Sequence, residues 1–182
     1  MAKLKISRDS LLPPMANFVL ENGLAPASLR PLAKAAGTSD RMLIYHFGSK
    51  ERLIEDLLEY IADIYADAID QSFGGERVTT RQECLERVMA FTAKAEMQPF
   101  MALWWEIVAG ATHNKPGYLE AGRSMMWLLL NWMKTQLPID DPDPEGGARY
   151  LLTMIEGALM LRAVGCDEIA RAGLGNADLG AA

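Results

Sequence analysis

Apolar residues recur along this chain at intervals of three and four, which is the spacing of a helix with one buried face. No stretch alternates apolar and polar residues between turn signals, as a half-buried strand would. The pattern therefore predicts an all-α fold. Helices are expected over residues 10–23, 28–36, 40–46, 50–73, 80–97, 99–113, 117–137 and 144–164.

The second and third expected helices are short and lie either side of a tight turn that contains Gly37. Ser28 and Ser39 each precede a helix, where a hydroxyl can accept a hydrogen bond from a free N–H group of the first turn. Two short helices joined by a glycine-containing turn predict a helix-turn-helix. The long helix that follows Ser49 would be about 36 Å long at 1.5 Å per residue.

Two proline residues, Pro13 and Pro14, interrupt the pattern of the first helix. They remove the N–H groups that would bond to the carbonyls of Asp9 and Ser10, so we expect the helix to start near Ser10 or to bend there. Thr80 and Glu83 have the spacing of a capping box at the start of the fifth helix.

The charge of the chain is unevenly distributed. The 182 residues carry a net charge of −6, but residues 1–52 alone hold eight basic and four acidic side chains, a net +4. The other 130 residues therefore carry −10. Such an asymmetry favours a nucleic-acid-facing end on an otherwise acidic protein. We predict a DNA-binding domain over 1–52, an effector-binding and dimerisation domain over 53–172, and a flexible tail over 173–182.

Several protein classes are excluded by composition. Cys84 and Cys166 lie far apart and only two histidines are present, which argues against a disulfide framework and a zinc site. Both cysteines are expected to be core residues, with redox sensing as an alternative. No long apolar run or signal peptide is visible, so a cytoplasmic protein without membrane contact is expected. No catalytic constellation, cofactor motif or metal-ligand spacing appears, so we predict no enzyme activity, no cofactor and no metal.

The segment from Ser28 to Ile54, SLRPLAKAAGTSDRMLIYHFGSKERLI, resembles the helix-turn-helix signature of the TetR/AcrR family of transcriptional regulators. The resemblance covers about a quarter of the chain. It implies a DNA-binding head followed by a divergent helical domain that binds an effector and dimerises.

The third helix is expected to enter the major groove, where base edges differ in their donors, acceptors and methyl groups. Arg41 can bond guanine, Asp40 can accept from cytosine and Met42 can contact a thymine methyl, while Leu43 is expected in the core. By resemblance Arg30 also reaches the groove. Phosphate contacts are expected from a further set: Ser28, Ser39, Tyr45, His46 and Lys50.

Other interpretations of these residues are open at this point. Tyr45 and His46 can be packing residues at a helix end, as we expect for Phe47. Asp40 and Arg41 can pair with each other or remain solvated. His113, beside a predicted helix end, is expected to be a structural cap.

All four tryptophans and eight of the eleven methionines fall between residues 89 and 160. These side chains suit an adaptable apolar cavity, but they equally suit a core or a dimer interface. The family resemblance favours a pocket for a small, largely apolar effector. Its expected lining is Phe100, Met101, Trp104, Trp105, Glu106, Met126 and Met154. Glu106 and Glu156 lie in apolar surroundings, where each can meet an effector or pair with Arg162 or Arg149.

By the same resemblance, the helices over 118–137 and 144–164 form a homodimer, with Gly157 and Ala158 allowing close approach. The dimer would bind double-stranded DNA at a palindromic operator with half-sites about 34–36 Å apart or somewhat more. The leading hypothesis is a repressor that its effector releases. The rival is a helical small-molecule-binding or protein-interaction dimer in which the helix-turn-helix is vestigial.

Overall fold

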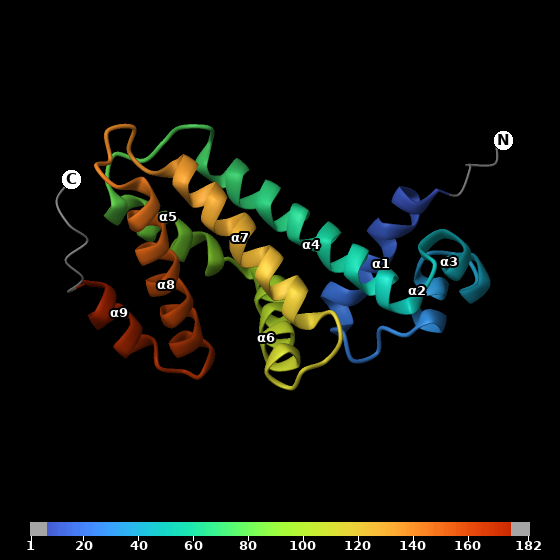
Figure 1. Cartoon of the computed structure of the whole chain (residues 1–182). Helices are drawn as coiled ribbons and strands as arrows, with labels where there is room; N and C mark the ends of the chain where they lie inside the picture. The colour runs from blue at the N-terminus through green and yellow to red at the C-terminus, as the bar shows by residue number, and fades with distance from the viewer. Residues whose placement is uncertain (1–6, 176–182) are drawn as a thin grey trace. The chain divides into compact units, whose positions relative to one another are not determined.

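The structure is a computed structural model that describes residues 7–175. Within these residues the regular structure is helical and includes no strand, which confirms the all-α prediction (Figure 1). None of the described helices is long and apolar enough to cross a membrane. The helices are α1 (Arg8–Asn22), α2 (Leu29–Ala35), α3 (Asp40–Phe47), α4 (Lys50–Phe73), α5 (Arg81–Thr92), the 3-10 helix η1 (Ala95–Met97), α6 (Gln98–Thr112), α7 (Tyr118–Gln136), α8 (Pro144–Ala163) and α9 (Asp167–Gly175).

The described residues form two compact units, each made of two stretches of chain. The first contains residues 7–65 and 95–125, and the second contains residues 66–94 and 126–175. Helices α4 and α7 contribute residues to both units. Of the predicted tail, residues 176–182 lie outside the described residues, and 173–175 form the end of α9.

The core of the first unit explains how α1, α2, α3 and α4 pack. Each helix buries at least one large apolar side chain, and Met15, Leu32, Leu43, Leu53 and Leu57 are all fully buried. These residues recur at the helical intervals seen in the sequence, so the buried faces follow the predicted pattern. Burial of such a side chain contributes about 1.5–3 kcal/mol.

Helix α1 begins at Arg8, two residues before the predicted start. Ser7 and Ser10 cap each other: the Ser10 N–H donates to the Ser7 hydroxyl at 3.3 Å, and the Ser7 N–H donates to the Ser10 hydroxyl at 2.9 Å. Because this capping box satisfies free N–H groups of the first turn, the helix forms although Pro13 and Pro14 lie inside it.

Three local predictions were wrong. The fifth helix ends at Thr92, and the chain continues through η1 instead of reaching Met97 in one α-helix. Helix α9 was not predicted; its nine residues bury only one side chain, that of Ala170. Ser28 stands at the start of α2, but its side chain makes no capping hydrogen bond.

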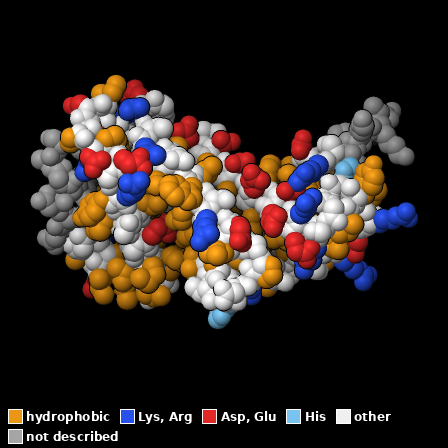
Figure 2. All heavy atoms as spheres, in the orientation of Figure 1, with side chains coloured by type: hydrophobic (Ala, Val, Ile, Leu, Met, Phe, Trp, Pro, Cys, Tyr) orange, Lys and Arg blue, Asp and Glu red, His pale blue; other side chains and the backbone are white. Residues whose placement is uncertain are grey.

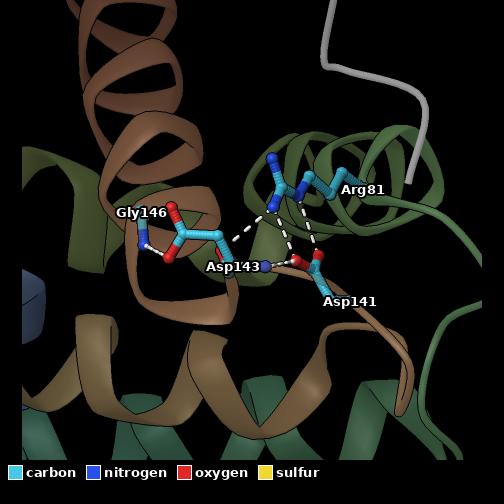
Figure 3. Close-up of polar contacts among 4 residues, drawn as sticks. All are labelled: Arg81, Asp141, Asp143 and Gly146. Atoms are coloured by element: carbon cyan, nitrogen blue, oxygen red, sulfur yellow. Dashed lines mark hydrogen bonds and ion pairs between the residues drawn. The ribbon is translucent and has the colours of Figure 1, made fainter.

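In the second unit, an ion pair joins the start of α5 to the loop between α7 and α8 (Figure 3). The Arg81 guanidinium donates two hydrogen bonds to the carboxylate of Asp141, at 2.8 and 2.5 Å, and a third to the carbonyl of Asp143 at 2.9 Å. The Asp141 side chain is fully buried. Hydrogen bonds from Arg81 hold the pKa of Asp141 below its ordinary value.

The same cluster fixes the start of α8. Asp143 caps the helix by accepting from the Gly146 N–H at 2.9 Å, as Figure 3 shows. A side chain at Gly147 would collide with the Arg81 guanidinium, so the guanidinium lies directly against the backbone of α8. The first turn of α8 is thereby held against α5.

Candidate nucleic-acid interface

Helices α2 and α3 form the predicted helix-turn-helix, with a turn at Gly37. Gly37 has a φ of 62°, a left-handed conformation that glycine adopts without strain. The Ser39 hydroxyl accepts from the Met42 N–H at 3.3 Å, which is the predicted cap of α3. Leu43 and Phe47, one turn apart, are the residues that α3 buries, as expected. The remaining residues of α3 are left on its outer side or at its edges.

Most of the predicted DNA-contacting side chains are exposed in the structure. Tyr45 is 78% exposed, the highest value among the large apolar and aromatic residues of α3. Met42 is half-buried. Figure 2 shows Lys and Arg side chains at the surface of the part that holds α2 and α3. The other exposed members of the set are Ser28, Arg30, Ser39, Asp40, Arg41 and Lys50.

Asp40 and Arg41 are adjacent on the first turn of α3. No hydrogen bond or ion pair links their side chains, nor does either bond elsewhere among residues 7–175. Both groups can therefore reach an external partner without first breaking an internal contact.

His46 is more enclosed than its neighbour. Its ring packs edge-on against Tyr45, with the centroids 5.2 Å apart. Its Nε2 atom is buried and has no hydrogen-bond partner in the described part of the chain.

Arg8 supports the interface, and the sequence analysis did not identify it. Its guanidinium forms an ion pair with Asp56 of α4 and lies over the Phe47 ring, 5.4 Å from the centroid. The hydrogen bond with Asp56 raises the pKa of Arg8. Arg8 thus links the start of α1 to the end of α3 and to α4. The partners are 48 residues apart in sequence, so no local pattern indicates the pair.

Glu106, a predicted effector residue, hydrogen-bonds the end of the first helix. Its carboxylate accepts from the Leu24 N–H at 2.9 Å. Gly23 precedes Leu24 with a φ of 78°, and a Cβ there would collide with the Glu106 carboxylate. The two arginines considered as partners of Glu106 pair elsewhere, Arg149 with Glu145 and Arg162 with Asp167.

The other predicted effector residues lie on three helices. On α6, Trp104 is buried, and the adjacent Trp105 is half-buried, as expected of neighbours on different faces. The Phe100 ring packs against Tyr65, with the centroids 5.7 Å apart. The half-buried members of the set are Phe100, Met101, Trp105, Glu106, Met126 on α7 and Met154 on α8.

The two cysteines differ in burial. Cys84 is fully buried, and burial raises the pKa of its thiol to about 12. Because the thiolate is the reactive form, Cys84 is inert at neutral pH. Cys166 is half-buried. His113 is the C-cap residue of α6, in line with the structural role expected for it.

Comparison with known proteins identifies the helix-turn-helix segment. Residues 19–57 match the family model of bacterial regulatory proteins of the tetR family. This range contains α2, α3, the first turns of α4 and all of the predicted DNA-contacting residues. No curated protein sequence matches the chain significantly.

Solved structures resemble the chain over nearly its whole length. A transcriptional regulator from Rhodococcus sp. Rha1 is 22% identical, with a TM-score of 0.67 over 93% of this chain and 92% of that one. GusR from Salmonella enterica is 25% identical, with a TM-score of 0.59 over 90% and 86%. A TetR transcription regulator from Haloarcula marismortui is 18% identical, with a TM-score of 0.65 over 92% and 93%.

Proposed function

We propose that this chain is a repressor, which a small, largely apolar effector releases from a palindromic operator. The chain belongs to the tetR family of bacterial regulatory proteins and is a DNA-binding transcriptional regulator. The observation that carries the proposal is the exposed face of α2 and α3. It presents Arg30, Asp40, Arg41 and Tyr45 above a fully buried core. Members of this family are regulators and not enzymes.

The proposed contacts divide into base recognition and phosphate binding. Arg41 and Arg30 are assigned to guanine O6 and N7, since a guanidinium can donate two parallel hydrogen bonds to that edge. Asp40 is assigned to a cytosine amine, and Met42 to a thymine methyl. The groups assigned to phosphates are the hydroxyls of Ser28, Ser39 and Tyr45, the ring of His46 and the ammonium of Lys50.

Dimerisation is proposed through α8 with α7. Tyr150, Met160 and Val164 lie on one side of α8 and are 41%, 50% and 66% exposed. A Cβ at Gly157, on the same side, would meet open space. Figure 2 shows hydrophobic side chains gathered at the surface near the end of α8 and α9. Burying these side chains against a second copy would remove apolar surface from water.

The proposed effector contacts are the residues predicted from the sequence: Phe100, Met101, Trp104, Trp105, Met126 and Met154. Binding can lower operator affinity only if the effector prefers one of two conformations. Glu106, which the sequence also assigned to the effector contacts, lies on α6 and accepts a hydrogen bond from the Leu24 N–H just after α1. A shift of α6 would therefore affect this bond. The proposed place of action is the cytoplasm.

Selection of bound sequences from a random pool of double-stranded DNA tests the proposal. The expected product is a palindrome whose half-site centres are about 34–36 Å apart or somewhat more. Enrichment of no sequence would contradict DNA recognition. Once an operator is in hand, a small-molecule library can be screened for compounds that weaken binding; compounds that bind the protein but leave operator affinity unchanged would contradict the switch.

A further inference from the structure

The first unit contains a cavity of about 240 Å³, and of the residues given a role in the proposed function only Lys50, a proposed phosphate contact, lines it. Its walls come from the loop between α1 and α2, from one side of the first turns of α4, and from the loop between α6 and α7. None of the predicted effector residues lines it. An engineered cavity of about 150 Å³ holds benzene, so this one has room for a benzene ring with a short chain.

Part of the lining of the cavity is apolar and buried. Leu24, Ala27 and Leu58 line it, and they are 6%, 5% and 3% exposed. An apolar group placed against these three side chains would leave water, which is favourable in proportion to the area covered.

Two walls of the cavity are held in place by contacts outside it. The Leu24 N–H is bonded to Glu106, which fixes the backbone of the α1–α2 loop. The Tyr118 ring lies directly on Gly110 of α6, where even a Cβ would collide with it. A site whose walls are already ordered loses less entropy when a ligand binds.

The lining also includes charged side chains, with more carboxylates than cations. Glu51 and Glu55 lie one turn apart on α4 and line the cavity together with a single cation, Lys50. Glu51 accepts hydrogen bonds from its own N–H and from the Ser49 hydroxyl, which lower its pKa and keep it ionised. Glu55 has no hydrogen bond or ion pair within residues 7–175, so its carboxylate is available.

We propose that this cavity is a binding site for a small amphipathic amine. The apolar group of the amine contacts Leu24, Ala27 and Leu58, and its ammonium lies beside Glu55 and Glu51. The site is separate from the predicted effector residues, so occupancy of one does not require the other.

Titration of the full-length protein with 2-phenylethylamine, followed by two-dimensional amide NMR, tests the proposal. Phenylacetate and 2-phenylethanol are matched probes that replace the ammonium with a carboxylate and a neutral hydroxyl. The amine should shift the amides of Leu24, Ala25, Ala27, Gly117 and Tyr118 and bind about tenfold more tightly than either analogue. Equal affinity for phenylacetate, or shifts confined to other residues, would overturn the proposal.

Variants locate the site. Glu55→Gln should weaken binding of 2-phenylethylamine about fivefold, because it removes one exposed negative charge from the cavity lining. Glu59→Gln, one turn further along α4 and outside the cavity, should change it less than twofold. Ala27→Leu should abolish binding, because the larger side chain would fill space beside the apolar lining. Equal effects of the two glutamine variants, or tight binding to a folded Ala27→Leu, would contradict the assignment. The assay contains no DNA, so either outcome leaves the proposed regulator function standing.

Discussion

Helices α3 and α8 each leave one side uncovered in the described part of the chain, and the chemistry of the two sides differs. The outer side of α3 is polar and charged, with Arg41 and Tyr45 exposed. That of α8 is mostly apolar, with Tyr150 and Met160 exposed around Gly157. A charged surface is stable in water and can exchange water for phosphates or base edges, whereas an apolar surface is stabilised by contact with another apolar surface. The contrast supports the proposals of DNA at α3 and of a second copy of the chain at α8.

The largest expected effect is a loss of operator affinity when the exposed arginines of α2 and α3 are removed. The double variant Arg30→Ala with Arg41→Ala should weaken binding to the selected operator about 1,000-fold, since each bidentate contact with guanine is worth about 1–3 kcal/mol. Fluorescence anisotropy with labelled operator measures the change. Arg77→Ala removes an exposed arginine outside α2 and α3 and is the control. Operator affinity that is the same in the double variant and the control would remove base recognition from these two residues.

The next effect concerns the ion pair that holds the start of α8. Arg81→Ala should lower the free energy of unfolding by about 3 kcal/mol, because it leaves the buried Asp141 carboxylate without its partner. Urea denaturation followed by circular dichroism measures it. Arg171→Ala, at an exposed position of α9, is the control and should change little. A loss below about 0.5 kcal/mol for Arg81→Ala would mean that the pair is not structural.

A charge on the apolar side of α8 should disrupt the dimer. Met160→Asp is expected to raise the dimer dissociation constant about 30-fold, or about 2 kcal/mol, because a carboxylate would be buried without a partner. Analytical ultracentrifugation measures the constant. Ile139→Asp is the matched control, since Ile139 is 88% exposed but lies in the loop between α7 and α8. Equal effects of the two variants would place the interface elsewhere.

The smallest effect is a pH dependence. The pKa of Asp141 is lowered from its ordinary value of 3.8, so the ion pair stabilises the fold above about pH 3.8 and that stability is lost as the pH falls towards the lower, folded-state pKa. Asp141→Asn should therefore lose less stability than the wild type between pH 5 and pH 3. Asp140→Asn, at the exposed neighbouring position, should keep the wild-type dependence. Identical pH profiles of stability for Asp141→Asn and the wild type would contradict the stabilising role of the ion pair between Arg81 and Asp141.

The sequence predicted those parts of the fold that local signals determine. Ser39 caps α3 as expected, and Leu43 and Phe47 are buried as expected. Caps and turns involve residues within a few positions of one another, so their pattern is visible in one segment. The assignment of Ser39 and of the exposed residues of α2 and α3 to DNA contacts stays a prediction.

Contacts between distant segments could not be predicted. The bonds from Arg8 to Asp56 and from Arg81 to Asp141 join residues 48 and 60 positions apart. Helical periodicity indicates which side of a helix is buried, but not which other helix covers it. For the same reason Glu106 was recognised as a carboxylate in apolar surroundings, while its partner, the Leu24 N–H, was not.

The bond between Leu24 and Glu106 also bears on the order in which the protein folds during synthesis. The Leu24 N–H obtains its acceptor only after 82 further residues have been added to the chain. The first unit is interrupted by residues 66–94, so it cannot be completed when the helix-turn-helix alone has left the ribosome. The DNA-binding segment thus acquires its final support late, after α4, α5 and most of α6 have been made.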